Sequence, residues 1–444
     1  MKQSNIYYKR YAYLKHEDAD EREGEEKEIS KEIIEKMLMT IGREIMRERN
    51  VTNRELEQKL ESMFRNEVIE IDKENSEGDD MPLIRYIKKV GYIKEDEKIL
   101  TSKGFNVIGR LLLRDIMSTL KEGDFGMHET TKYGYGTTTL DTSKQYEIGE
   151  DIRLLNVPKS LLNTIQRLAR YNNEISIPLD INVEDFEVFE CVKDIRTTII
   201  YCIDLSSTMR YSTSLGDMSR IEVAKRALWS LYILNEKFFP TDSIYIIGFG
   251  ALATKIKPSD IPYLKTFEPG NDFLHYTNYQ SAFRLANKIL EKDPSTEKRL
   301  VLITDGHPSA CFVDNDMEKE KILGARSYTH FYKPDKNTLD NVEKKMKIHI
   351  DTSSGDLVYL CYRYKKVDSY IGEKTINEAK KCYKNGILID TIMISEEESL
   401  LKYINDMEKH VKGRSYYINP ANLDKMLITD YILNKRNIIN KRRF

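Results

Sequence analysis

A seven-residue apolar stretch restricts the fold of this chain more than any other feature. Residues 197–203 read Thr-Thr-Ile-Ile-Tyr-Cys-Ile and have no polar face. Runs of this composition occur in the central strands of parallel sheets, where helices cover both faces of the strand. We therefore expect a buried strand here, in the middle of a sheet with helices on both sides.

Segments with helical and strand-like patterns alternate from this stretch to residue 433. Helices are expected at 220–239, 279–290, 374–384, 397–410 and 422–433, and strands at 243–249, 299–303, 387–394 and 415–418. This alternation predicts an α/β fold with a doubly wound, mostly parallel, Rossmann-like sheet. In such sheets, ligands bind at the carboxyl ends of the strands.

Oxygen-bearing side chains gather where the strands are expected to end. Three follow the strand at 197–203, one follows the strand at 299–303, and one lies in a loop directly before the helix at 279–290. Because the carboxyl ends of parallel strands share one edge, these loops can converge on one point. The residues are Asp204, Ser206, Thr208, Thr277 and Asp305.

The chemistry of these side chains points to a metal. Carboxylate and hydroxyl oxygens are hard ligands that suit Mg²⁺ or another divalent cation such as Mn²⁺ or Ca²⁺. Ser206 and Thr208 are two residues apart in an extended loop, so both hydroxyls can point to one side. Neutral hydroxyls leave the charge of the ion partly uncompensated, which would attract a carboxylate from another molecule. We therefore predict a metal site that binds acidic groups.

The same five residues resemble the metal-ion-dependent adhesion site (MIDAS) of von Willebrand factor A (VWA) domains. In that family the first motif usually reads Asp-x-Ser-x-Ser, whereas this chain has Thr208 in the last place and keeps the hydroxyl. Three motifs in the expected order, each placed after a strand or before a helix, are much more specific than the first motif alone. The resemblance implies a VWA fold and binding of an acidic residue of a partner protein.

The resemblance extends, more loosely, to about residue 100. Leu100-Thr-Ser-Lys-Gly104, Asp124–Glu129 and Asp185-Phe-Glu-Val-Phe189 are similar to segments of prokaryotic VWA proteins akin to CoxE and the magnesium chelatase D subunit. Members of that class work with AAA+ ATPases of the MoxR or chelatase type. The resemblance therefore implies an AAA+ ATPase or its client as the partner, and leaves a non-catalytic subunit of a metal chelatase as an alternative.

Residues 1–122 are expected to form a mainly helical N-terminal domain. Thr52 and Glu55 have the spacing of a capping box at the start of a helix. A helix at 83–89, a turn at Gly91, a short hairpin and a helix at about 105–120 resemble a winged-helix unit. A nucleic-acid-linked regulator is therefore an alternative, although acidic residues at 95–97 offset the basic pair at 88–89 and make nucleic-acid binding the weaker hypothesis.

The other domain boundaries follow from changes of pattern. Residues 123–195 are expected to be a connector with a glycine- and threonine-rich loop at 123–142, a helix at 159–171 and a strand at 185–190. The VWA domain is expected at 196–434, and a basic tail at 435–444. An insertion at about 309–356 begins at the metal-bearing loop, so it either lies over the ion or is a surface loop.

Composition and missing motifs favour a non-enzymatic cytoplasmic protein. The 70 basic residues nearly balance the 72 acidic ones, so no overall charge directs the chain to nucleic acid or membranes. The sequence has no P-loop, no His-Glu-x-x-His and no Gly-x-Ser-x-Gly. Its five cysteines are isolated, and there is no apolar run of the length of a signal peptide or membrane span.

Overall fold

The computed structural model describes residues 31–47, 51–72, 83–94, 99–119, 138–147, 155–170, 179–192, 196–212, 218–270, 272–325, 330–361, 367–394, 398–411, 413, 415–417 and 423–440. Among the helices in these ranges, none is long and apolar enough to cross a membrane.

A seven-stranded sheet forms the centre of the molecule, with the strand order β12-β11-β6-β3-β4-β5-β9. In sequence order the strands are β3 (Thr197–Asp204), β4 (Ser243–Phe249), β5 (Ala253–Ile256), β6 (Glu297–Thr304), β9 (Ile350–Asp351), β11 (Ile387–Met393) and β12 (Ser415–Tyr417). The five strands from β12 to β4 are parallel, and β5 and β9 are antiparallel. The predicted mostly parallel sheet, with residues 197–203 near its middle, is confirmed.

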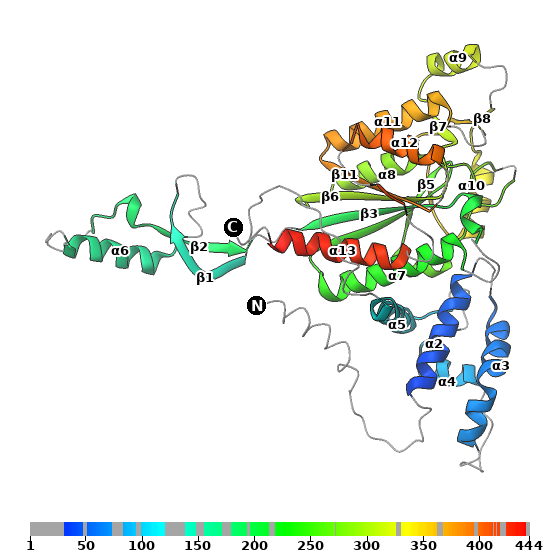
Figure 1. Cartoon of the computed structure of the whole chain (residues 1–444), viewed down its shortest axis with the longest axis horizontal. Helices are drawn as coiled ribbons and strands as arrows, with labels where there is room; N and C mark the ends of the chain where they lie inside the picture. The colour runs from blue at the N-terminus through cyan, green and yellow to red at the C-terminus, as the bar shows by residue number, and fades with distance from the viewer. Residues whose placement is uncertain are drawn as a thin grey trace.

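Helices cover both faces of this sheet (Figure 1). One face carries α8 (Tyr279–Glu291), α11 (Ser369–Lys384) and α12 (Glu398–Glu408), and the other carries α7 (Arg220–Phe238) and α13 (Leu423–Asn440). Side chains of β3 alternate between two apolar cores, with Ile199, Tyr201 and Ile203 in the core beneath α7. Ile200 and Cys202 belong to the core beneath α8. Both faces of the strand are therefore buried, which explains why the segment has no polar face.

The N-terminal helices share the core beneath α7. They are α2 (Lys31–Met46), α3 (Asn53–Asp72), α4 (Leu83–Lys89) and α5 (Ser102–Thr119). Trp229 of α7 is fully buried and stacks on Phe105 of α5, with ring centroids 5.0 Å apart. Its Nε1 donates a hydrogen bond of 3.2 Å to the carbonyl oxygen of Phe105. The predicted helical N-terminal region is confirmed, and it packs directly on the sheet domain.

Local sequence signals in this region form the expected contacts. The backbone N–H of Thr52 donates to Glu55 Oε2 at 2.9 Å, and the N–H of Glu55 donates to Thr52 Oγ1 at 3.3 Å, which completes the capping box. Gly91 has a φ of 82°, and a β-bridge follows between Ile93 and Leu100. Both bridge residues are buried in the shared core. The described part of the expected hairpin is therefore one β-bridge whose two residues face the core, and residues 95–98 lie outside the described ranges.

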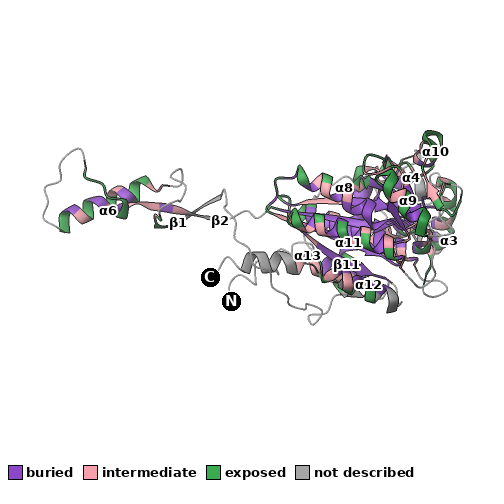
Figure 2. Cartoon of the chain, turned by 90° about the horizontal axis from the view of Figure 1, so that it is seen from above, coloured by how far each residue is buried: buried purple, intermediate pink, exposed green. Residues whose placement is uncertain are grey.

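A small unit projects away from the rest of the molecule (Figures 1 and 2). We call it the α6 unit; it consists of β1 (Thr138–Gln145), α6 (Val157–Arg170), η3 (Val183–Asp185) and β2 (Glu187–Val192). β1 and β2 pair antiparallel from Thr138 opposite Val192 to Gln145 opposite Glu187. The expected loop is therefore wrong for residues 138–142, which are strand because threonine-rich segments pair readily with a second strand. Residues 123–137 lie outside the described ranges.

The expected insertion is a folded element. It contains β7 (Ala310–Phe312), α9 (Asp316–Ala325), β8 (His330–Tyr332), α10 (Lys336–Met346) and β10 (Val358–Leu360), and its strands form an antiparallel sheet in the order β7-β10-β8. The interpretation as a plain surface loop is wrong, and the inserted fold extends past 356 to residue 360. The expected tail also needs correction, because α13 continues through Asn440.

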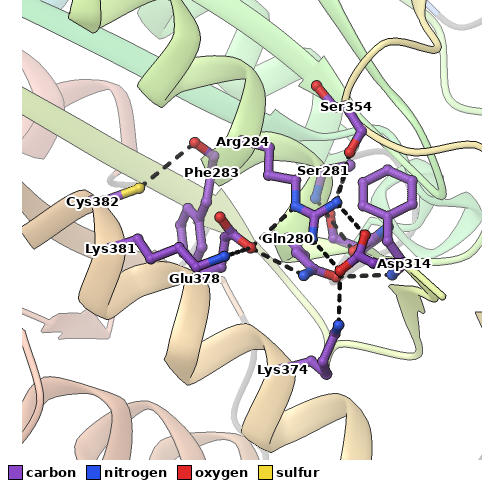
Figure 3. A network of polar contacts seen from close by, with 12 residues as sticks. Gln280, Ser281, Phe283, Arg284, Asp314, Ser354, Lys374, Glu378, Lys381 and Cys382 are labelled. Atoms are coloured by element: carbon purple, nitrogen blue, oxygen red, sulfur yellow. Dashed lines mark hydrogen bonds and ion pairs between the residues drawn. The ribbon is translucent and has the colours of Figure 1, made fainter. Parts of the chain in front are cut away.

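A polar network that includes the buried Glu378 and the exposed Asp314 fixes the insertion to the sheet domain (Figure 3). Arg284 of α8 pairs with Asp314 of the insertion at 2.8 Å and with Glu378 of α11 at 3.1 Å. It also donates to the carbonyl oxygen of Ser354 at 2.7 Å. Lys374 of α11 contacts the same Asp314 carboxylate at 2.9 Å. Several charge-assisted bonds to one arginine hold both ends of the insertion against α8 and α11.

Candidate metal centre at the carboxyl edge of the sheet

Neighbouring strands bring two of the predicted ligand segments together. β3 and β6 pair in parallel up to Ile203 and Ile303, so Asp204 ends β3 beside the end of β6. The carboxylate of Asp204 accepts hydrogen bonds on both oxygens, from the Ser206 N–H and from Thr304 Oγ1, each at 2.8 Å. The first bond turns the chain directly after the strand and brings Ser206 back over the aspartate.

A chain of side-chain contacts joins four of the five predicted residues. The Ser206 and Thr208 hydroxyl oxygens lie 3.1 Å apart. Thr208 Oγ1 donates to Asp305 Oδ1 at 2.8 Å, which connects the loop after β3 to the loop after β6. Together with the Asp204–Ser206 contact, these bonds gather two carboxylates and two hydroxyls at one point of the sheet edge. This is the arrangement that the motif spacing predicts.

Thr277 reaches the same edge through its backbone. It lies two residues before α8 and is buried. Its N–H donates to Ser309 Oγ at 3.0 Å, and its carbonyl oxygen accepts from the Ser309 N–H at 2.8 Å. The Tyr279 hydroxyl, at the start of α8, lies 3.3 Å from Thr304 Oγ1 and donates to the carbonyl of Gly306. The third loop is thus bonded to the segment that carries Asp305, while the role of the Thr277 hydroxyl as a ligand stays a prediction.

Burial gives both carboxylates unusual proton affinities. Asp204 is fully buried, and this burial together with the charge of Asp305 raises its pKa to about 7. Burial also raises the pKa of Asp305, although the nearby Arg220 guanidinium acts in the opposite direction. Two buried carboxylates that repel each other are stabilised by a cation between or beside them.

The donor set fits a hard divalent cation. It offers two carboxylates and neighbouring hydroxyl oxygens, with no sulfur or imidazole among the five predicted ligands. No group of three or more His, Cys, Asp or Glu side chains that could hold a metal occurs within the described ranges. The candidate site has only two such side chains, because hydroxyls take the place of further carboxylates.

Two polar residues at the site were missed by the sequence prediction. Thr304 orients Asp204, and Arg220, the first residue of α7, forms an ion pair with Asp305 Oδ2. The position of Thr304 at the end of a strand and directly before Asp305 was a usable signal. Nothing in the sequence pattern indicated Arg220, because its contact with Asp305 depends on where the first turn of α7 lies relative to the sheet edge.

Family comparisons identify the domain. Residues 197–353 match the model of the vWA domain of Rv0959-like proteins, and residues 138–191 match the model of the third domain of the same proteins. The matched range 197–353 contains every predicted metal ligand. This chain is therefore a VWA-domain protein, with a helical region before the domain and a mostly parallel central sheet within it.

Individual proteins with similar sequences share only a quarter of their residues with this chain over the matched region. The uncharacterized protein Rv0959 of Mycobacterium tuberculosis and the uncharacterized protein Mb0984 of Mycobacterium bovis are each 25% identical over 218 residues, which is 49% of this chain. The match covers 30% of the length of these relatives.

Two solved structures are also only distantly similar to this chain. The PilB minor pilin of Streptococcus sanguinis aligns with a TM-score of 0.38 and 17% identity, over 56% of this chain and 64% of the pilin. The vWF domain of the type V pilus tip protein Mfa5 of Porphyromonas gingivalis aligns with a TM-score of 0.37 and 14% identity, over 55% and 96% respectively.

Proposed function

We propose that this chain is a non-catalytic interaction protein whose VWA domain binds a divalent cation, Mg²⁺ by preference, and thereby binds an acidic side chain of a partner protein. The proposed ligands are Asp204, Ser206, Thr208, Thr277 and Asp305. The observation that carries this proposal is the continuous set of contacts from Asp204 through Ser206 and Thr208 to Asp305. These residues come from two loops 97 positions apart and still share one point.

Each residue has a distinct part in such a site. Asp204 and Asp305 supply the negative charge, and the hydroxyls of Ser206 and Thr208 supply neutral oxygens. Thr304 and the N–H of Ser206 hold both oxygens of Asp204 in place. A divalent cation bound here would offer an open coordination position to a carboxylate from another molecule.

The surroundings of Ser206 support a ligand role over catalysis. A nucleophilic serine needs a base within hydrogen-bond reach of its hydroxyl. Ser206 Oγ lies 3.1 Å from the Thr208 hydroxyl and also hydrogen-bonds the Asp204 carboxylate, whose two oxygens are already held by the Ser206 N–H and Thr304 Oγ1. An arrangement of paired hydroxyls beside carboxylates fits metal ligation, and we therefore propose that the chain has no enzymatic activity of its own.

The proposed partner is a MoxR-type AAA+ ATPase or its client, in the assembly of a protein or metal-cofactor complex. Its support is the resemblance of the motifs to CoxE-like and chelatase D-like proteins. We also propose a cytoplasmic location, supported by Cys202, Cys311, Cys361 and Cys382, which are all free thiols. The burial of the bridge residues Ile93 and Leu100 gives the nucleic-acid alternative less support.

Calorimetry with Mn²⁺ and Mg²⁺ tests the metal site directly. We expect one divalent ion per chain, and loss of binding in Asp204→Asn and Asp305→Asn, which keep the size of the side chain and remove its charge. Asp368→Asn is a matched control, because Asp368 is also buried and also accepts backbone N–H groups, from Tyr370 and Ile371 at the start of α11. Unchanged binding in both site variants would refute the proposed ligand set.

Partner binding is tested separately by pull-down with the co-expressed ATPase encoded nearest to this chain. We expect capture in Mg²⁺, and loss of capture in EDTA and in Asp305→Asn. Capture that survives both treatments would show that the partner binds elsewhere.

A further inference from the structure

Arg220 is held beside the proposed metal ligands by well-defined local structure. It is the first residue of α7, directly after the N-cap Ser219. Ser219 and Glu222 form a capping box, with the Ser219 N–H donating to Glu222 Oε2 at 3.0 Å. The N–H of Arg220 donates to the carbonyl oxygen of Tyr211 at 3.2 Å, which ties it to the end of the loop that carries Ser206 and Thr208. The start of α7 is therefore fixed relative to that loop.

The side chain of Arg220 bridges the buried ligand set and solvent. Its Nη1 pairs with Asp305 Oδ2, and the Asp305 side chain is completely buried, whereas 22% of the Arg220 side chain is exposed. The buried Nε has no hydrogen-bond partner among the described residues. A guanidinium carries five N–H donors in a planar fork, so this residue has donors to spare beyond its bond to Asp305.

The net charge of the site shows what the Arg220 guanidinium adds to it. Asp204 and Asp305 together carry two negative charges when ionised, and the hydroxyl ligands carry none. A divalent cation would bring the net charge of this set to zero, so its attraction for an outside carboxylate would come from the open coordination position and not from net charge. Arg220 raises the total to one positive charge and places part of that charge toward solvent. Without a divalent cation, the same guanidinium occupies one oxygen of a proposed ligand.

We propose that Arg220 is a second cationic element of this site, which competes with the metal for Asp305 and, once a metal is bound, helps to bind the partner's carboxylate. This inference rests on the proposed function. It predicts two effects of opposite sign when the guanidinium is removed: tighter metal binding and weaker carboxylate binding. A residue with a purely structural role would change both in the same direction or neither.

Arg210 provides a matched control on the same side of the sheet. It belongs to η4 (Ser207–Arg210), in the loop that also carries Ser206 and Thr208. Its Nη2 donates to Thr266 Oγ1 at 3.2 Å, so its described bond is to a neutral hydroxyl and not to a metal ligand. Arg210→Gln removes one positive charge from the neighbourhood and leaves the Arg220–Asp305 pair intact.

The experiment uses the full chain with Mn²⁺ as the metal and acetate as the carboxylate. Mn²⁺ binding is measured by calorimetry, and acetate binding to the Mn²⁺-loaded protein by water-proton relaxation. For Arg220→Gln we expect Mn²⁺ to bind about three- to tenfold more tightly and acetate about three- to tenfold more weakly than in the unaltered protein. Arg220→Lys keeps the positive charge but lacks the planar guanidinium, so both of its affinities should lie between those of the unaltered protein and of Arg220→Gln. Arg210→Gln should leave both affinities within about twofold of the unaltered protein.

The outcomes separate this inference from the proposed function. If the unaltered protein does not bind Mn²⁺, the proposed function fails and this inference fails with it. If the unaltered protein binds Mn²⁺ but Arg220→Gln does not bind it more tightly, competition for Asp305 is refuted alone. Unchanged acetate affinity in Arg220→Gln refutes the carboxylate role. If Arg220→Gln unfolds below the measurement temperature, the test uses Arg220→Lys instead. Affinities of Arg220→Lys for Mn²⁺ and acetate equal to those of the unaltered protein would show that only the positive charge matters, and would refute a role for the planar guanidinium.

Discussion

The sheet edge and the α6 unit both bury an aspartate, and the two carboxylates have opposite properties. In the α6 unit, burial alone would raise the pKa of Asp185, but hydrogen bonds from Arg167, from the N–H of Asn182 and from Thr164 outweigh it and lower the pKa. At the sheet edge, burial and the charge of a second carboxylate raise the pKa of Asp204. Asp204 is the more deeply buried of the two and lies beside a second carboxylate, whereas a guanidinium bonds Asp185 directly.

This difference separates a structural polar core from a site that needs a ligand. Arg167 Nε donates to both oxygens of Asp185 at 3.0 and 3.1 Å, and Thr164 Oγ1 donates to Oδ2 at 3.1 Å, so the carboxylate is fully used inside the unit. Asp204 accepts from a hydroxyl and an N–H, both uncharged. A buried carboxylate held by neutral donors beside a second carboxylate is short of positive charge, and that shortage is what a metal would relieve.

The largest effect is expected from removing the aspartate of the α6 unit. Asp185→Ala leaves Arg167, Thr164 and the N–H of Asn182 without their shared acceptor, so α6 should lose its support. We expect hydrogen-exchange protection of the α6 amides to fall by about tenfold to a hundredfold. Mass-spectrometric hydrogen exchange measures this, with the exposed neighbour Glu184→Ala as the control. A change in Mn²⁺ affinity in Asp185→Ala would contradict this comparison, because it would show that the α6 unit and the sheet edge are coupled.

The pH dependence of metal binding is the next effect, and it should belong to the sheet edge alone. A protonated Asp204 must lose its proton to ligate a cation, and its pKa is about 7. Mn²⁺ affinity should therefore fall about tenfold for each pH unit below that value and level off above it. In the metal-free protein the sign reverses: the raised pKa means that the folded state loses stability as pH rises from the ordinary value of 3.8 toward 7.

The acid behaviour of the α6 unit provides the contrast to this titration. The lowered pKa of Asp185 contributes stability that is present above its ordinary value of 3.8 and is lost as the pH falls through its value in the folded protein. Protection of α6 should therefore not change between pH 8 and 5, measured by hydrogen exchange corrected for the intrinsic rate. A pH-independent Mn²⁺ affinity over the same range would contradict the raised pKa of Asp204.

The sequence predicted the sheet and the meeting of four of the five candidate residues, because both depend on which residues follow which strand. A strand such as β3, buried on both faces, must be apolar throughout, and Asp204, Ser206 and Thr208 follow it within one loop. Their meeting with Asp305 follows from the parallel pairing of β3 with β6. Arg220 could not be predicted in this way, because its contact depends on where α7 begins and on how that helix approaches the edge.

The insertion and the α6 unit show where periodicity stops being informative. The three insertion strands are three residues long each, which is too short for an alternating pattern to be recognised. In α6 the apolar spacing correctly predicted a helix, but it did not predict which face of the helix is covered. The structure buries Ser160, Thr164 and Leu168 and leaves Leu162 and Ile165 exposed. Helical spacing fixes which residues share a face, whereas the neighbouring strands decide which face is covered.

The smallest effect is therefore expected from an apolar residue of α6. Leu162 is 52% exposed, so Leu162→Ser should change the free energy of unfolding by less than about 0.5 kcal/mol. The matched control is Leu231→Ala in α7, which is fully buried and should cost about 2–5 kcal/mol, because it removes apolar contacts and leaves a cavity. Urea denaturation followed by circular dichroism measures both, and hydrogen exchange localises the change. A loss of more than about 1 kcal/mol in the free energy of unfolding of Leu162→Ser would mean that other residues cover this face of α6 in solution. The contacts around Asp185 would then not be enough to account for the stability of the α6 unit.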